Sequence, residues 1–263
     1  MSVRRGGRLT ASLCLFAAAF AAPAVVSAAD ALPPGFVYLH DVDPTIVQDI
    51  RYASADNFVG RPLPGYGAAE CVLRRDAALA LKQVQADLAL AGLGLKVYDC
   101  YRPTRAVRAM AQWANNGGSG RATKRFFPKL EKNNLFALGY IATRSAHSTG
   151  TAVDLTLVAR PSTPAAKFDP AASYGSCAGP ATERAPDDSL DVGTGFDCFD
   201  PASHTANGAI GEEQRRRRAT LVTAMRARGF RNYFREWWHF SYGAPGGSYD
   251  VPIGPRAGKP QTH

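Results

Sequence analysis

The residues best suited to chemistry lie in two short motifs of the chain. The later motif places Glu236 three residues before His239, inside a run of aromatic side chains. The earlier motif places His147 ahead of Asp154, which opens an apolar stretch. Imidazole and carboxylate groups are ligands of hydrolytic zinc centres, which keep three protein ligands and one open position for water. The sequence therefore predicts a hydrolytic metal centre of His147, Asp154 and His239, with Glu236 as a spare carboxylate.

His147 and Asp154 do not define a metal site by themselves, because the same pair is typical of a turn followed by an ordinary aspartate at a strand start. Gly150 lies between them and lets the backbone reverse or approach closely, so that both side chains can converge on one ion. The other histidines lie near the start of the mature chain, in a polar run and at the C-terminus: His40, His204 and His263.

Glu236 is predicted to act as the proton carrier of the site. Residues three apart on a flat strand point to opposite faces, so Glu236 must lie in the turn that enters the strand carrying His239. From there it would take a proton from the attacking water and give it to the leaving amine. Trp237 and Trp238 would exclude water and raise the proton affinity of the carboxylate. For one of them, plain core packing is an equally good interpretation, because alternation along a strand places them on opposite faces.

Arg102 is predicted to stabilise the oxyanion that forms during hydrolysis. The residue ends a strand and precedes Pro103, so its direction is rigidly set. The alternative is an ordinary ion pair with Asp99 or a surface carboxylate.

The elements that must position these residues follow from the hydrophobic pattern. The predicted helices and strands mix without a regular strand–helix–strand rhythm, which favours one α+β domain with a largely antiparallel central sheet flanked by helices. A stretch rich in Pro, Ala and Ser at residues 160–190 is predicted to be a surface excursion. The predicted helices cover residues 74–91, 104–114 and 212–228, and the predicted strands cover residues 46–52, 95–101, 152–158 and 237–242.

The first 29 residues are typical of a secretory signal peptide. Arg4, Arg5 and Arg8 precede an apolar run that ends in small residues. A retained membrane anchor is the alternative, but the apolar core is shorter than the roughly 20 residues that a bilayer requires. Cys14 lies inside the apolar run and not after it, which disfavours a lipoprotein anchor. We therefore expect a periplasmic or secreted protein whose mature domain, residues 30–263, is not inserted in a membrane.

The charge of the chain does not point to nucleic acid. Removal of the three signal arginines lowers the formal net charge from +9 to +6, which is modest for this length. The basic run Arg215 to Arg218 follows Glu212 and Glu213, and this arrangement is typical of a solvated helix face with its own counter-charges.

Four cysteines remain in the mature chain, and exported proteins keep disulfides. Four cysteines allow three pairings. We favour Cys71 with Cys100 and Cys177 with Cys198, because each pair closes a local loop. Zinc binding by these thiols is the alternative, and the absence of any Cys-x-x-Cys spacing disfavours it.

Several motifs together resemble one family, the zinc D-alanyl-D-alanine dipeptidases of the vancomycin-resistance type, which belong to the LAS or M15 peptidases. The resemblance extends from about residue 46 to residue 242. It implies the hedgehog-like zinc peptidase fold and one Zn²⁺ per chain. The motifs that carry it lie at residues 51–60, 98–103, 145–157, 195–197, 206–208 and 236–239.

The resemblance also implies roles for individual residues. His147, Asp154 and His239 match the zinc ligands, Glu236 the catalytic acid and base, and Arg102 the oxyanion stabiliser. Pocket residues follow in the same way: an acidic side chain suits the free ammonium of a dipeptide, and hydroxyls suit its terminal carboxylate. The matched pocket residues are Ser145, Tyr52, Tyr66 and Asp197.

The function that the resemblance implies is hydrolysis of the D-Ala-D-Ala dipeptide to two D-alanines. An exported enzyme would meet dipeptide released by cell-wall turnover, so salvage or wall remodelling is favoured over antibiotic resistance. Two alternatives stay open. One is a D,D-carboxypeptidase that trims terminal D-Ala from peptidoglycan peptides, and the other is a wall-binding module that holds a metal without hydrolysis.

Overall fold

The structure is a computed structural model that describes residues 31–116, 120–162 and 166–256. The predicted signal peptide at residues 1–29 lies outside these ranges. Within them, no helix is long and apolar enough to cross a lipid bilayer.

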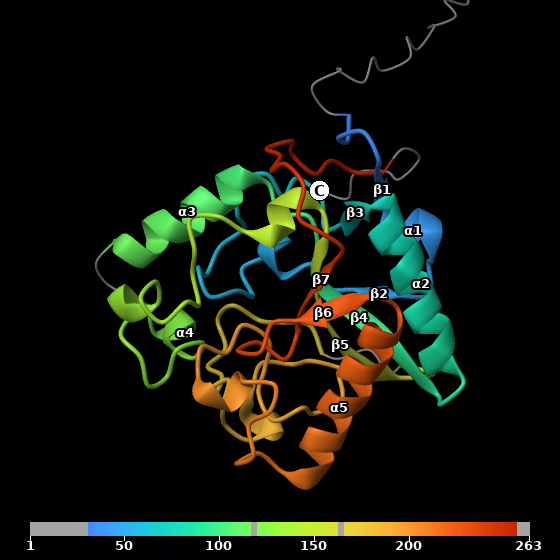
Figure 1. The fold of residues 1–263 in the computed structure, drawn as a ribbon. Coiled ribbons are helices and arrows are strands. Elements are labelled where there is room, and N and C mark those ends of the chain that lie inside the picture. The colour runs from blue at the N-terminus through green and yellow to red at the C-terminus, as the bar shows by residue number, and fades with distance from the viewer. Residues whose placement is uncertain (1–30, 117–119, 163–165, 257–263) are drawn as a thin grey trace, which may run out of the picture.

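A five-stranded sheet forms the centre of the molecule (Figure 1). Its strand order is β2–β4–β5–β7–β6. β2 runs parallel to β4, and the other neighbouring pairs are antiparallel. The prediction of an α+β domain with a largely antiparallel sheet is therefore confirmed. The strands are β2 Val47–Gln48, β4 Leu93–Asp99, β5 Ala152–Ala159, β6 Phe230–Asn232 and β7 His239–Tyr242.

Two long helices, α2 (Arg75–Ala89) and α5 (Glu212–Ala227), contact each other and the sheet, while α3 (Thr104–Asn115) lies on the other side of the molecule (Figure 1). α2 buries the apolar stripe that its sequence pattern predicts. Gly92 follows with a φ of 67°, the left-handed conformation that commonly ends a helix. All three predicted helices are confirmed to within two residues of their ends.

The remaining elements are short, and the sequence pattern did not predict them, because three or four residues carry too little periodicity to be recognised. The strands β1 and β3 pair in a small second sheet. These elements are α1 Leu39–Val42, α4 Arg121–Lys124, β1 Phe36–Tyr38, β3 Val72–Arg74 and 3-10 turns at Arg51–Ala53, Lys132–Asn134, Ala146–Thr149, Ala181–Glu183 and Pro201–Ser203.

The small sheet explains why a glycine is required between His147 and Asp154. The ring of Phe36 in β1 lies directly against Gly150, where an added Cβ would lie 2.1 Å from a ring carbon. The φ of Gly150 is 74°, which other residues rarely adopt. Both the close approach and the reversal expected at this position are present.

Two predicted strands differ from the structure. The strand expected at residues 46–52 is only β2, because the chain turns at Arg51–Ala53. The strand expected at 237–242 begins at His239, whose N–H donates to the Glu236 carbonyl oxygen (3.2 Å) and closes a turn. The two tryptophans therefore do not alternate along a strand, and both are buried.

The excursion at 160–190 is largely exposed in its first half, but its end joins the sheet. Ser189 forms a bridge to Val158 of β5, and the N–H of Leu190 donates to the Leu157 carbonyl oxygen (2.8 Å). Asp187 pairs with the buried Lys96 of β4 (2.5 Å). The last residues of the excursion are therefore an anchored part of the domain.

The basic run at the start of α5 is not uniformly solvated. Arg215 and Arg216 are exposed, and Arg216 pairs with Glu212 and Glu213 as predicted. Arg218, in contrast, is buried, with 1% of its surface exposed. The prediction of a solvated face is wrong for Arg218. It follows the exposed Arg216 by two residues, about half a turn of helix, and therefore lies on the opposite, inner face.

Both favoured disulfide pairings are confirmed, Cys71 with Cys100 and Cys177 with Cys198. The second bond ties the excursion to the segment that follows Phe196. Cys177 and Cys198 are both buried.

Replacement of Cys177 and Cys198 together by serine should lower the free energy of unfolding by about 3 kcal/mol, the loop-closure entropy expected for their separation of 21 residues. Denaturant unfolding under non-reducing conditions measures the change. Wild-type protein under reducing conditions should lose more stability than this variant, because reduction also opens the Cys71–Cys100 bond. A loss well below 1 kcal/mol would show that the bond constrains little in the unfolded chain.

Candidate metal centre

Three side chains converge in the manner of metal ligands. His147 comes from the turn Ala146–Thr149, and Asp154 and His239 are direct partners in the register of β5 and β7. His147 Nε2 lies 3.1 Å from His239 Nδ1 and 3.2 Å from Asp154 Oδ1, and the last two atoms lie 2.9 Å apart. Tetrahedral ligands about 2.1 Å from zinc lie roughly 3.4 Å from one another. The donor types and their spacing therefore fit one metal ion.

The backbone orients His147. Its Nδ1 lies 2.7 Å from the Cys100 carbonyl oxygen and must donate to it, because a carbonyl can only accept. In a neutral ring this leaves the lone pair of Nε2 directed at the other two ligands. Asp99 Oδ2 lies 3.3 Å from the same Nδ1 and adds a second partner.

Arg102 enters the site through Asp99. Its guanidinium pairs with Asp99 Oδ2 at 2.8 Å, lies 3.6 Å from Asp154 Oδ2, and sits over the Tyr52 ring. Arg102 also lines the cavity above the three ligands. The alternative weighed from sequence, a pair with Asp99, is thus present, and it aims the arginine at the cavity.

Glu236 lies in the turn before β7, as the spacing predicted. Its carboxylate is 3.9 Å from His239 Nδ1, so it is beside the ligand group and not part of it. Burial, together with the charge of Asp154, raises the pKa of Glu236 to about 8. A cation at the ligand group would lower this pKa again, because positive charge favours the carboxylate.

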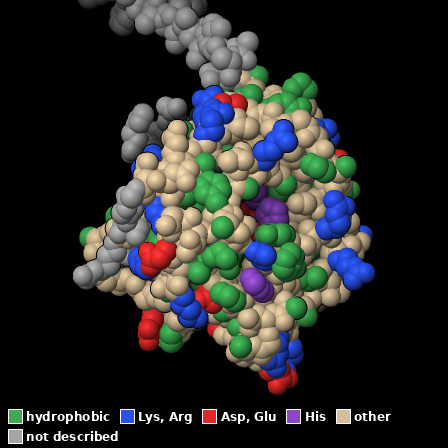
Figure 2. Space-filling view, turned by 60° about the vertical axis from the view of Figure 1, so that its left-hand side comes forward, with side chains coloured by type: hydrophobic (Ala, Val, Ile, Leu, Met, Phe, Trp, Pro, Cys, Tyr) green, Lys and Arg blue, Asp and Glu red, His purple; other side chains and the backbone are tan. Residues whose placement is uncertain are grey.

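A cavity of about 340 Å³ opens beside the ligands. Figure 2 shows a hollow with a histidine side chain inside it, bordered by apolar and basic side chains. Trp238 forms part of its wall, whereas Trp237 faces the other way and donates from Nε1 to Thr194 Oγ1 (2.8 Å). Trp238 therefore helps to exclude water from the site, and Trp237 packs behind it.

Three of the four predicted pocket residues border this cavity. Asp197 is buried, has a φ of 56°, and accepts a hydrogen bond from the Tyr52 hydroxyl at 2.8 Å. Burial, then the charge of Asp154, holds the pKa of Asp197 well above its usual range. Ser145 also lines the cavity, and its hydroxyl accepts from the His147 N–H. Tyr66 does not border it, because its hydroxyl donates to Asp99 (2.5 Å).

Comparisons with known proteins assign the chain to one family, over a range that includes the residues of this site. The family model described as D-ala-D-ala dipeptidase, of the M15 peptidases, matches residues 33–166 and 161–254. The chain belongs to this family. It is 31% identical to the D-alanyl-D-alanine dipeptidase of Enterococcus faecalis over 78% of this chain and 90% of that protein. Enzymes of the same name from Enterococcus faecium and Streptomyces coelicolor are 30% and 32% identical, each over 83% of this chain and 98% of the relative.

Membership makes the protein a peptidase of a zinc-dependent family, and the residues that can hold the metal ion are present in this M15 chain. The enzyme class inferred from the two motifs is therefore confirmed. The individual roles assigned to Glu236, Arg102 and the pocket residues stay predictions, which the geometry above supports.

Two residues of this M15 site were missed by sequence reasoning. Asp99 was considered only as a rival partner of Arg102, yet it joins Arg102, Tyr66 and His147 in one buried cluster. Arg144 is exposed at the cavity wall and forms no ion pair within the described part of the chain. Its position one residue before Ser145 was the signal available in the sequence.

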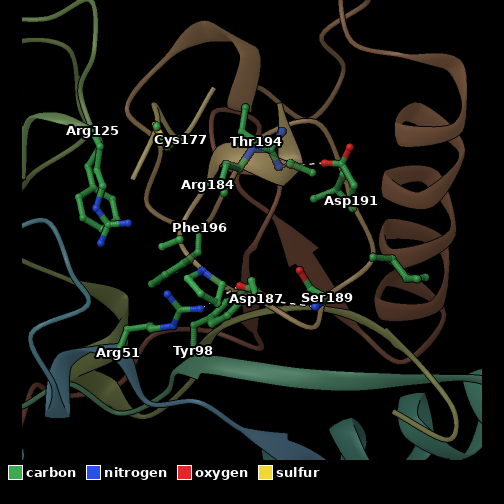
Figure 3. A pocket seen from close by; sticks show the side chains of 18 of the residues that line it. Arg51, Tyr98, Arg125, Cys177, Arg184, Asp187, Ser189, Asp191, Thr194 and Phe196 are labelled. Atoms are coloured by element: carbon green, nitrogen blue, oxygen red, sulfur yellow. Dashed lines mark hydrogen bonds and ion pairs between the residues drawn. The ribbon is translucent and has the colours of Figure 1, made fainter. Parts of the chain in front are cut away.

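A second cavity, of about 300 Å³, lies behind this site in the M15 domain (Figure 3). Phe196 and Trp237 face it, while their sequence neighbours Asp197 and Trp238 face the metal side. The arginines that line this cavity have carboxylate partners. Arg51 pairs with Asp187 (2.8 Å), Arg125 with Asp56 (2.6 Å) and Arg184 with Asp191 (2.9 Å). Of the ion pairs of Asp187, the one with Lys96 of β4 fastens the excursion to the sheet, and the one with Arg51 ties it to the turn Arg51–Ala53.

Proposed function

We propose that this peptidase hydrolyses D-Ala-D-Ala to two D-alanines with one zinc ion held by His147, Asp154 and His239. The observation that carries the proposal is the convergence of these ligands beside Glu236, in a cavity whose wall includes the buried Asp197. Bound zinc would supply a Lewis acid that polarises the peptide carbonyl and lowers the pKa of water. The relatives that carry the dipeptidase name support the substrate.

Asp197 recognises the free ammonium of the dipeptide. Burial and the charge of Asp154 raise the pKa of Asp197, and an ammonium beside it would favour the charged carboxylate. Tyr52 holds the carboxyl in place through its hydroxyl. A buried carboxylate of this kind selects substrates with an unblocked amino end.

Glu236 moves the proton. It accepts one from the attacking water and donates it to the leaving amine, which requires a carboxylate near the reacting atoms but outside the ligand set. Its burial and its distance from His239 meet that requirement. Arg102 faces the same space and stabilises the negative charge that develops on the carbonyl oxygen.

Arg144 binds the carboxylate end of the dipeptide. The hydroxyls of Tyr52 and Tyr66 are engaged by Asp197 and Asp99, so Ser145 and Arg144 remain for that end. Arg144→Ala should raise KM for D-Ala-D-Ala about tenfold, the effect of losing one charge-assisted hydrogen bond of ~1.5 kcal/mol.

The matched control for Arg144 is the dipeptide amide, which lacks the carboxylate. Wild type and Arg144→Ala should hydrolyse the amide equally well. Steady-state kinetics on the two substrates measure the difference. An unchanged KM of Arg144→Ala for the free dipeptide would show that Arg144 does not bind the substrate carboxylate.

The enzyme acts outside the cytoplasm, on dipeptide released by cell-wall turnover, in salvage or remodelling. The basic and apolar pattern of residues 1–29 and the two disulfides support this location, because disulfides persist in oxidising compartments. Fractionation of cells that express the full chain checks it. Activity confined to the cytoplasmic fraction would contradict the location.

Release of D-alanine from D-Ala-D-Ala, with and without a chelator, tests the proposed reaction. We expect turnover that the chelator abolishes and added zinc restores. A wall pentapeptide ending in D-Ala-D-Ala is the second substrate, and faster release from it would favour the D,D-carboxypeptidase. Bound zinc without turnover of either substrate would favour a wall-binding module, against which the spare Glu236 already argues.

A further inference from the structure

The buried arginine of α5 has an unusual set of partners. Arg218 donates from Nε to the Val192 carbonyl oxygen (2.8 Å), and from its two terminal nitrogens to those of His204 (2.7 Å) and Ala202 (2.9 Å). Within the described residues, no carboxylate forms an ion pair with it. Its guanidinium thus binds three carbonyls spread over one segment, residues 192–204.

A buried cation without a paired anion is costly, because burial removes it from water. The burial lowers the pKa of Arg218 to about 10, below the usual range for arginine. Apolar residues of similar volume often serve a protein core equally well or better. An arginine supplies three hydrogen bonds here that an apolar side chain cannot form, and these bonds fix the positions of the three carbonyls.

The segment that Arg218 holds carries Asp197 in its middle. Asp197 has a φ of 56°, a conformation that a residue other than glycine keeps only when its surroundings impose it. Ser203 donates from its hydroxyl to the carbonyl oxygen of Cys198 at 2.7 Å, one residue beyond Asp197. The carbonyls bound by Arg218 thus lie on both sides of the strained residue.

The same segment is joined to the turn that carries Glu236. Trp237 donates from its backbone N–H to the Ser203 carbonyl oxygen (3.1 Å) and from its ring to Thr194, whose hydroxyl also contacts Ser203. Arg218 itself lies 6.0 Å from the Trp237 ring centre. One buried network therefore spans the helix, the Asp197 segment and the catalytic turn.

We propose that Arg218 is a positioning residue for the ammonium site, holding the carbonyls of Val192, Ala202 and His204 so that Asp197 faces the substrate. The inference rests on the proposed dipeptidase function and extends it by naming what sets the selectivity for a free amino end. Arg218 does not touch the substrate, since it does not line the catalytic cavity.

The test compares Arg218→Met and Arg218→Lys with Arg216→Met. Arg216 belongs to the same basic run and is exposed, so its replacement is the matched control. Each variant is assayed on D-Ala-D-Ala and on N-acetyl-D-Ala-D-Ala, which lacks the ammonium. Zinc content and the Tm are measured on the same preparations.

For Arg218→Met we expect KM for the free dipeptide to rise about tenfold to a hundredfold, because a misplacement of about 1 Å can cost that much. Zinc content and turnover of the acetylated substrate should stay near wild type, so the preference for the free amino end falls. Lysine should restore only part of that preference, since it keeps the charge and loses the planar fork. Arg216→Met should match wild type.

An unchanged preference in both Arg218 variants, whatever the change in Tm, would overturn the positioning role. If methionine prevents folding, the lysine variant decides alone. An inactive wild-type enzyme would defeat the proposed function itself and this inference with it. Active wild type with an unaltered preference in the variants would defeat only the role of Arg218.

Discussion

Glu236→Gln will lose about a thousandfold in kcat on D-Ala-D-Ala and keep its zinc. A positioned acid–base group contributes about 10²- to 10⁴-fold, and glutamine has the same shape but cannot carry the proton. Zinc is retained because Glu236 is outside the group formed by His147, Asp154 and His239. Release of D-alanine measures turnover, and elemental analysis of the purified protein measures the metal.

Glu212→Gln is the control for this substitution, because it makes the same chemical change on an exposed helix surface. It should leave both activity and zinc content unaltered. If the Glu236→Gln enzyme keeps more than about a tenth of wild-type kcat, a group other than Glu236 carries the proton. A variant that loses its zinc would instead make Glu236 a ligand.

Asp197→Asn will lower kcat/KM for the free dipeptide by about 10- to 100-fold, since a buried hydrogen bond to a charged group is worth roughly 1.5–3 kcal/mol. The variant keeps the shape of the carboxyl and its contact with Tyr52, but it cannot balance an ammonium. Steady-state kinetics on D-Ala-D-Ala measure the loss.

The same substitution should not destabilise the fold. The pKa of Asp197 is higher in the folded protein than in the unfolded chain, so the carboxyl lowers stability as pH rises above its unfolded value of about 4. Asparagine does not ionise, so the variant does not lose this folding stability as the pH rises. The Tm of Asp197→Asn should therefore equal or exceed that of wild type at neutral pH, and the difference should narrow as the pH falls towards about 4.

Asp87→Asn is the matched control, because Asp87 lies on the surface in an ion pair with Arg228 that lowers its pKa. It should leave activity unchanged and give no gain in Tm. An Asp197→Asn enzyme with normal kcat/KM would place the substrate ammonium elsewhere. A clear fall in its Tm would mean that the folded protein stabilises the Asp197 carboxylate.

Much of the fold was predictable, because the signals are local. The stripe of α2 and the cap at Gly92 depend on neighbours within a few turns of helix. Strands as short as β1 or β3 carry no such signal. The start of β7 was placed two residues too early, at Trp237 and not at His239, because tryptophans are typical of strands.

Residue types and local spacing by themselves determined the chemistry of this protein. They predicted a set of metal ligands, a spare glutamate, the two disulfides and the domain class, because each depends on which donors exist and on short-range geometry. The prediction that Glu236 carries the proton also rests on local geometry, since only a turn places Glu236 beside His239.

Only the tertiary structure decided which side chains meet, because burial and pairing depend on residues far apart in the chain. The register of β5 and β7 brings Asp154 opposite His239. Asp99 could not be recognised as the partner shared by His147 and Tyr66, because they lie far from it in sequence. Arg218 has the same residue type as its exposed neighbours, and only the segment packed against α5 makes it a buried donor to three carbonyls.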